Sequence, residues 1–186
     1  MSNISIKEMI NAGVHFGHQS KYWNPKMRPF IYTTFKKLHI INLEKSITHF
    51  NDAKSFIEKI TKNNSKILFV GTKRAARDII AKYAAEAKMP FVNIRWLGGM
   101  LTNWGTISGS IKKMKKYETD LVAENRGFTK KELLKMSVKK DKLERSLGGI
   151  AEMKKTPDLV FIIDTNYESL AIAESVKLSI PIIAIL

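Results

Sequence analysis

Hydrophobic residues recur along this chain as short continuous runs, separated by stretches with helical spacing. Continuous apolar runs predict four buried strands, at residues 66–71, 90–93, 159–164 and 180–186. Apolar residues three and four apart predict helices, at residues 45–62, 73–88 and 167–178. Such an alternation is typical of a parallel sheet covered on both faces. We therefore predict an α/β/α sandwich with a mainly parallel, flavodoxin- or Rossmann-like sheet. In the second helix, the side chains expected to face the core are Ile79, Ile80, Tyr83, Ala84 and Ala87.

The N-terminal part of the chain does not follow this alternation. A short helix is expected after Ser5, which is spaced to form a capping box with Glu8, and Gly13 is expected to end it. The next segment is rich in His, aromatic and basic residues, and we expect it to be irregular over residues 14–29. Two short strands follow, at residues 30–33 and 38–42, joined by a turn that carries Lys36 and Lys37.

About 65 residues separate the second and third strands of the predicted sheet, far more than one crossover helix needs. Heptad-like spacing predicts two helices there, through Ile107, Ile111, Met114, Leu121, Leu133, Met136, Leu143 and Leu147. Thr129 and Glu132 form a second predicted capping box, and residues 125–127 break the two helices. We predict an antiparallel coiled-coil hairpin, residues 105–147, inserted into one globular domain, residues 1–104 and 148–186.

Charge narrows the choice of partner. The chain has 32 Lys and Arg against 17 Asp and Glu, a net charge of +15. Residues 1–64, 65–111 and 112–145 carry +6, +5 and +6, whereas residues 146–186 carry −2. A surplus of this size is typical of a protein that binds a polyanion, and the alternative is a basic protein without an anionic partner. The anion-binding surface is expected in the first three-quarters of the chain, and the last quarter is expected to serve the core or protein contacts.

Composition also excludes several function classes. The chain has no cysteine, so disulfides and thiolate metal sites are absent. The first residues, MSNISIKEMI, are not those of a signal peptide, and no apolar run has the roughly 18 residues of a membrane span. We expect an intracellular protein with no membrane partner, no small-molecule substrate and no cofactor. The apolar final strand, IPIIAIL, favours a chain that continues beyond Leu186.

Residues 68–76 (LFVGTKRAA) follow a predicted strand and open a helix, the place where such folds bind phosphate. This loop has a single glycine and matches neither common nucleotide-binding motif. A nucleotide-binding enzyme or switch is therefore the disfavoured alternative, and an RNA phosphate held by Lys73 and Arg74 is the favoured interpretation.

The other candidate sites carry no catalytic pattern. His15 and His18 lack further metal ligands nearby, so packing or hydrogen bonding is favoured over a metal site. Asp164 ends a strand without a nucleophile or base beside it, which favours a helix-capping role. The segment RWLGGMLTNW, at residues 95–104, leaves two interpretations open. In one, its Arg and Trp side chains stack RNA bases; in the other, the Trp side chains pack the hairpin against the sandwich, and the two are compatible.

Seven segments of this chain resemble the bacterial form of the small-subunit ribosomal protein two ("S-two") family. They are 12–18 (AGVHFGH), 22–28 (YWNPKMR), 39–45 (HIINLEK), 66–76 (KILFVGTKRAA), 95–104 (RWLGGMLTNW), 146–150 (SLGGI) and 157–164 (PDLVFIID). The resemblance implies an α/β/α domain with a coiled-coil hairpin and no enzymatic activity. It also implies binding to small-subunit ribosomal RNA between head and body, near the messenger exit, and docking of ribosomal protein one. A loop, a short strand and a C-terminal helix are implied after Leu186.

Charge, position and resemblance together give one set of candidate RNA-binding residues. They are His15, His18, Lys21, Trp23, Asn24, Lys26, Arg28, Lys36, Lys37, Lys73, Arg74, Arg95, Trp96, Thr102, Asn103, Lys112, Lys113, Lys115 and Lys116. A third hypothesis remains open beside RNA binding and nucleotide binding: the apolar face of the hairpin docks a helical protein partner.

Overall fold

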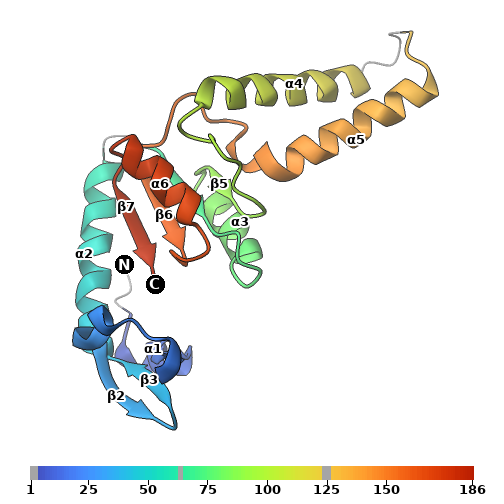
Figure 1. Cartoon of the computed structure of the whole chain (residues 1–186). Helices are drawn as coiled ribbons and strands as arrows, with labels where there is room; N and C mark the ends of the chain where they lie inside the picture. The colour runs from blue at the N-terminus through green and yellow to red at the C-terminus, as the bar shows by residue number, and fades with distance from the viewer. Residues whose placement is uncertain (1–3, 63–64, 123–126) are drawn as a thin grey trace. The chain divides into compact units, whose positions relative to one another are not determined.

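The computed structural model describes residues 4–62, 65–122 and 127–186. It divides into two compact units, Met1–Lys59 and Ile60–Leu186, which are described separately below. Figure 1 shows the elements of both units along the chain. The two-part domain with an insertion at residues 105–147 is a different division of the chain and stays a prediction.

The N-terminal unit holds a small antiparallel sheet, two 3-10 turns and two helices. The strands β1 (Phe16–Gln19), β2 (Ile31–Phe35) and β3 (Leu38–Ile41) lie in the order β1-β3-β2. Helix α1 (Ile6–Asn11) begins at the predicted capping box of Ser5 and Glu8, which is confirmed. The remaining elements are η1 (Ser20–Tyr22), η2 (Pro25–Phe30) and α2 (Leu43–Thr61).

Strand β1 corrects the expectation that residues 14–29 are irregular. Its sequence, FGHQ, has no alternation of apolar and polar residues that would predict a strand. It is a strand because it pairs with β3, with Phe16 opposite Ile40 and Gln19 opposite Leu38. Pairing with a partner some 20 residues away is decided by tertiary contact, which local pattern does not encode.

The C-terminal unit is built on a four-stranded parallel sheet flanked by helices. The strands are β4 (Ile67–Val70), β5 (Phe91–Val92), β6 (Leu159–Ile163) and β7 (Ile182–Ile185), in the order β5-β4-β6-β7. The helices that follow β4 and β6 are α3 (Arg77–Glu86) and α6 (Ser169–Lys177). The four predicted strands and the mixed α/β class are confirmed, with each strand shorter than its apolar run.

The core lies on the two central strands, where Leu68, Val70, Val160 and Ile162 are fully buried. On α3 the buried residues are Ile80 and Ala84, as predicted. The prediction that Ile79, Tyr83 and Ala87 also face inward is wrong: Ile79 and Tyr83 are 56% and 60% exposed, and Ala87 is exposed at the helix end. The sheet covers only one narrow stripe of this helix, and residues one position away lie about 100° around the axis.

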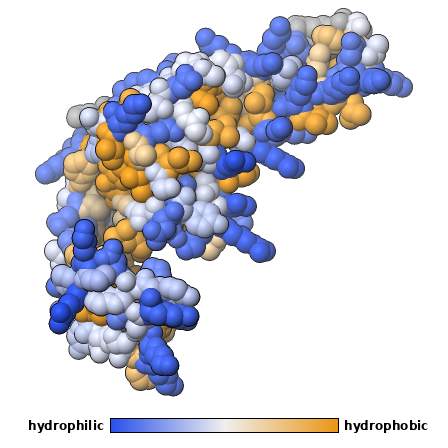
Figure 2. Space-filling model, in the orientation of Figure 1, coloured by the Kyte–Doolittle hydropathy of each residue, from blue (hydrophilic) through white to orange (hydrophobic). Residues whose placement is uncertain are grey.

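Two long helices, α4 (Trp104–Val122) and α5 (Lys130–Leu147), follow one another and pack together. Ile107, Ile111 and Met114 are buried at the predicted spacing, and Thr129 caps α5 in the predicted capping box. Figure 2 shows hydrophilic side chains along these helices and hydrophobic ones between them. The predicted break at residues 125–127 lies largely outside the described residues. The supercoil of a coiled coil stays a prediction.

The base of α5 meets the sheet through a glycine. The turn η3 (Gly148–Ile150) lies against β5, and a Cβ atom added at Gly149 would collide with the carbonyl oxygen of Phe91. It would also lie 2.9 Å from the Phe91 ring. Only glycine permits this approach of two backbones, so the SLGGI segment joins α5 to the edge of the sheet.

Gly149→Ala is expected to lower the free energy of unfolding by roughly 1–3 kcal/mol, because the added methyl overpacks the contact with Phe91. Urea denaturation followed by circular dichroism measures this change. Gly109→Ala is the control, since a Cβ there meets nothing within 4 Å. In the middle of α4 it should raise stability by up to about 1 kcal/mol. Equal effects of the two substitutions would contradict this account.

Candidate nucleic-acid interface

The loop that joins β5 to α4 wraps around one carboxylate, that of Glu174 on α6. Oε1 accepts hydrogen bonds from the Trp96 indole Nε1 at 3.0 Å and the Gly99 amide at 2.7 Å. Oε2 accepts from the Leu101 amide at 2.9 Å and from the amide and hydroxyl of Thr102 at 3.0 and 3.1 Å. Gly99 has a φ of +83°, which turns its amide inward and favours glycine at this position.

This carboxylate is held in its ionised form. Burial raises the pKa of Glu174, but the hydrogen bonds from Thr102, Trp96, Leu101 and Gly99 outweigh it and lower the pKa to about 2. The charge therefore stays on Glu174 at neutral pH and fixes the loop to α6.

Trp96 and Thr102 thus have internal roles in the structure. Trp96 is only 6% exposed and belongs to the core, so its ring offers no face for an RNA base. The Thr102 hydroxyl is bonded to Glu174. Of the two interpretations left open for residues 95–104, packing is favoured for these two side chains. Arg95 and Asn103 are exposed and stay candidates for RNA contact.

The loop after β4 places Lys73, Arg74 and the backbone amide of Thr72 where related folds bind phosphate. Here the chain's own carboxylates occupy these positions. The Thr72 amide donates to Glu168 at 2.6 Å, and Glu168 is 2% exposed. The Lys73 ammonium pairs with Asp164 at 2.7 Å, an ion pair that lowers the pKa of Asp164. A nucleotide phosphate would have to displace both carboxylates.

Asp164 was expected to cap a helix, and the structure corrects this. Its Oδ1 accepts from the amides of Asn166 and Tyr167 at 3.1 and 3.3 Å, which closes a turn before α6 begins. Asp164 itself has a φ of +70°. The carboxylate therefore caps a tight turn, and α6 starts without a side-chain cap.

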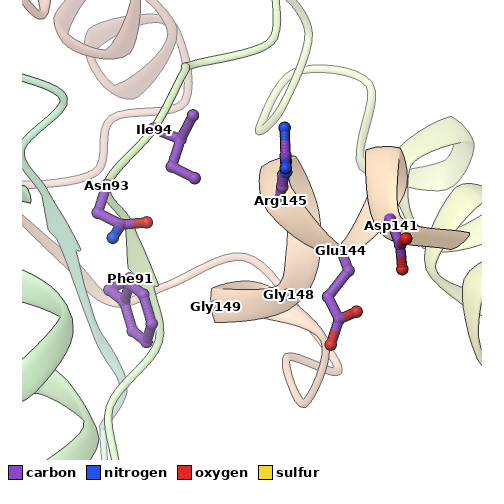
Figure 3. Close-up of a pocket in the computed structure, with 8 residues that line it drawn as sticks. All are labelled: Phe91, Asn93, Ile94, Asp141, Glu144, Arg145, Gly148 and Gly149. Carbon is purple, nitrogen blue, oxygen red and sulfur yellow. The ribbon is translucent and has the colours of Figure 1, made fainter. Parts of the chain in front are cut away.

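Clefts of two sizes lie among residues 65–122 and 127–186 of the C-terminal unit. The larger, about 400 Å³, is lined by Phe91, Asn93, Ile94, Asp141, Glu144, Arg145, Gly148 and Gly149. Figure 3 shows the charged side chains of α5 on one side of this cleft and the β5 segment on the other. A second cleft of about 270 Å³ lies beside Thr72, with Arg77 and Arg95 in its lining. In the part of the chain that the structure describes, no three or more His, Asp or Glu side chains are grouped so that they could hold a metal ion.

The remaining basic candidates lie at the surface. Most are exposed, and His15 and Trp23 are half-buried. The Trp23 ring lies 5.0 Å from that of His39, and the His15 ring lies 4.0 Å from that of Phe16, which fits the packing role favoured for His15. On α4, the exposed lysines are next in sequence to the buried Ile111 and Met114; they are Lys112, Lys113, Lys115 and Lys116. Lys115 pairs with Glu152 at 2.7 Å.

The turn between β2 and β3 has an unusual backbone. Phe35 pairs with Leu38, so Lys36 and Lys37 form a two-residue hairpin loop, with φ values of +47° and +65°. This is the left-handed region that Asn and Gly prefer at such turns. Two lysines therefore occupy positions that are strained for them, and both are exposed.

Glu174 and Glu168 were not among the predicted site residues. Each lies more than 70 residues along the chain from the backbone amides that it binds. The sequence offers one weak indication of their role: both lie in the acidic last quarter of the chain, and a glycine-containing loop elsewhere in the chain has backbone amides that could bind them. That signal does not identify a contact without the fold.

The structure is thus that of a basic α/β protein in which Glu168 and Asp164 bind the loop after β4 and most of the candidate cations lie at the surface. Comparison with known families agrees. The family model described as Ribosomal protein S2 matches residues 9–186, and the chain belongs to this family. It is therefore a structural constituent of the small ribosomal subunit that serves translation, in a family that is generally non-enzymatic. No helix among the described residues has the length and apolarity to cross a membrane.

Glu174→Gln is expected to destabilise the protein by about 2 kcal/mol or more at neutral pH. The amide keeps the shape of the side chain but removes the charge and turns one acceptor into a donor facing N–H groups. Urea denaturation measures the loss. Glu152→Gln, which changes an exposed carboxylate, is the control and should have little effect.

The stability of the native protein should also depend on Glu174 in acid. Its folded pKa is about 2, below the usual 4.5, so its contribution is complete above pH 4.5 and is lost as pH falls towards 2. The difference in free energy of unfolding between the native protein and Glu174→Gln, measured at each pH, isolates the contribution of this one carboxylate. That difference should shrink from pH 6 to pH 2. A constant difference would contradict the assignment.

Proposed function

We propose that the protein binds small-subunit ribosomal RNA through the cations of the N-terminal segment, the loop ends of the parallel sheet and helix α4. The uneven charge carries this proposal. Residues 1–145 hold all of the positive surplus, while residues 146–186 carry −2. Membership of the family implies RNA and other ribosomal proteins as partners. The positive residues then neutralise phosphates, and the acidic last quarter is left for protein contacts.

We further propose the position that the resemblance implies. The protein lies in the cytoplasm on the ribosome, between head and body of the small subunit near the messenger exit. There it supports docking of ribosomal protein one. The contacts of the loop after β4 disfavour nucleotide binding, because the Thr72 amide is already hydrogen-bonded to Glu168 and the Lys73 ammonium is already paired with Asp164.

RNA affinity should fall steeply with salt. For some six phosphate contacts, a plot of log affinity against log salt has a slope of about −4 to −5. Lys112→Glu with Lys116→Glu should lower affinity and make the slope shallower by about 1.5 to 2. Filter binding with small-subunit RNA over a salt series measures both. Lys115 is left intact because its reversal would face Glu152.

The matched control for this pair is Lys154→Glu with Lys177→Glu, which reverses two exposed lysines of the acidic last quarter. It should leave both affinity and slope near those of the native protein. Equal losses from the two pairs would show that only net charge matters. A salt-independent affinity of the native protein would contradict RNA binding itself.

The strained turn offers a separate test. Lys36→Asn with Lys37→Gly places the residues preferred for this turn, so the thermal midpoint should stay level or rise while RNA affinity falls. Differential scanning calorimetry and the same binding measurement check the two effects. Lys82→Gln with Lys88→Gly is the control: it removes the same charge and relieves a φ of +53° at Lys88. Its RNA affinity should be unchanged.

A further inference from the structure

One face of the N-terminal sheet carries aromatic side chains that the unit leaves in water. Phe16 on β1 lies opposite Ile40, and Phe35 on β2 lies opposite Leu38. Leu38 and Ile40 are two residues apart on β3, so all four side chains share one face. We call these four residues the aromatic face. It is in the N-terminal unit, where Figure 1 shows β2 and β3 as a hairpin.

The aromatic face is apolar but not covered. Phe16 is 58% exposed and Phe35 is 62% exposed, while Leu38 and Ile40 are half-buried. Exposed rings grouped on one face indicate a binding surface. The Lys36 ammonium lies 5.4 Å from the centre of the Phe35 ring, so a cation accompanies this ring.

Charge around this face indicates which partner fits it. Residues 9–43, which include all three strands, contain five Lys and Arg and no Asp or Glu. Two of these cations, Lys36 and Lys37, form the strained turn directly after Phe35. A partner that suits both features has flat apolar rings linked by negative charges. Single-stranded RNA has this chemistry, whereas an acidic protein surface offers the charge without the rings.

We propose that unpaired bases of ribosomal RNA stack on Phe16 and Phe35 while Lys36 and Lys37 bind the adjoining phosphates. The proposal deepens the RNA-binding function and rests on it, since it adds base contacts and specifies an unpaired strand. Neither ring was among the candidates that charge and motif selected.

Sheet geometry favours unpaired bases over a duplex. The two rings lie on strands either side of β3 and two residues apart in register, which places them roughly 12 Å from each other. Neighbouring stacked bases of a helix are only about 3.4 Å apart. The rings therefore take bases that are splayed apart, which a continuous duplex does not provide.

The test compares two RNA probes with the full chain: a fluorescent ten-residue oligouridine and a ten-base-pair RNA duplex. Phe16→Ile and Phe35→Ile remove one ring each but keep an apolar residue suited to a strand. Each is expected to weaken oligouridine binding by roughly fivefold to a hundredfold, with duplex binding unchanged. Phe35→Tyr keeps the ring and should bind oligouridine as the native protein does.

Tyr83→Ile is the matched control. Tyr83 is 60% exposed, and Lys82 lies 5.4 Å from its ring, the same distance as in the Phe35 and Lys36 pair. It lies on α3, whose sequence includes Asp78 and Glu86. Replacing Tyr83 should change neither the affinity for oligouridine nor the affinity for the duplex. Circular dichroism and the thermal midpoint check that each variant is folded. Phe35 lies near the tip of its hairpin, so if Phe16→Ile does not fold, the Phe35→Ile variant alone tests the proposal.

The outcomes separate this proposal from the RNA-binding function. Oligouridine affinity equal to the native value in the Ile variants would overturn the stacking proposal and leave RNA binding intact. Equal losses for oligouridine and duplex would also overturn it, as would loss of small-subunit association with unchanged RNA affinity, which indicates a protein partner. If the native protein bound neither probe nor ribosomal RNA, the RNA-binding function itself would fail.

Discussion

The hydrogen-bonded carboxylate of Glu174 organises the C-terminal unit. Five donors from residues 96–102 converge on it, and they outweigh the cost of its burial strongly enough to hold its pKa at about 2. The loop leads directly into α4, so the same carboxylate fixes the point where the helical pair leaves the sheet. A charged group with several backbone donors is costly to replace, because any substitute leaves several N–H groups without an acceptor.

The parallel sheet has an architecture that nucleotide-binding proteins also use, but its loop after β4 is occupied differently. Its strand order places the ends of β4 and β6 side by side, the position where such sheets bind ligands. In this chain Glu168 and Asp164 supply the negative charge there internally. The loop is consequently joined to the start of α6 by the chain's own carboxylates, while Arg74 beside it and the lysines of α4 remain exposed. The fold alone does not indicate whether this position binds an external ligand or the chain's own carboxylates. The side chains that occupy the position decide it.

The N-terminal unit differs from the C-terminal unit in how little of it is buried. Of its described residues only Leu43 is buried, and several aromatic rings remain in water. Its sheet is held by strand pairing, and its turn is formed by two lysines with positive φ. A unit with so small a core buries little apolar surface to offset the entropy of folding, and any partner that binds only its folded form would stabilise it. Its composition, cationic without acids over residues 9–43, is the reason RNA is the partner proposed for it.

The sequence by itself determined the fold class, the four strands of the parallel sheet, both capping boxes and the charge asymmetry. These follow from local periodicity and composition, and the seven motifs identified the family. Tertiary structure decided the rest. Strand β1 exists through pairing with β3, and Ile79 and Tyr83 face water because the sheet covers a narrow stripe of α3. Trp96 is internal, where it packs in the core and donates to Glu174. Each of these depends on residues far apart in the chain, and a linear pattern contains no information on which distant groups meet.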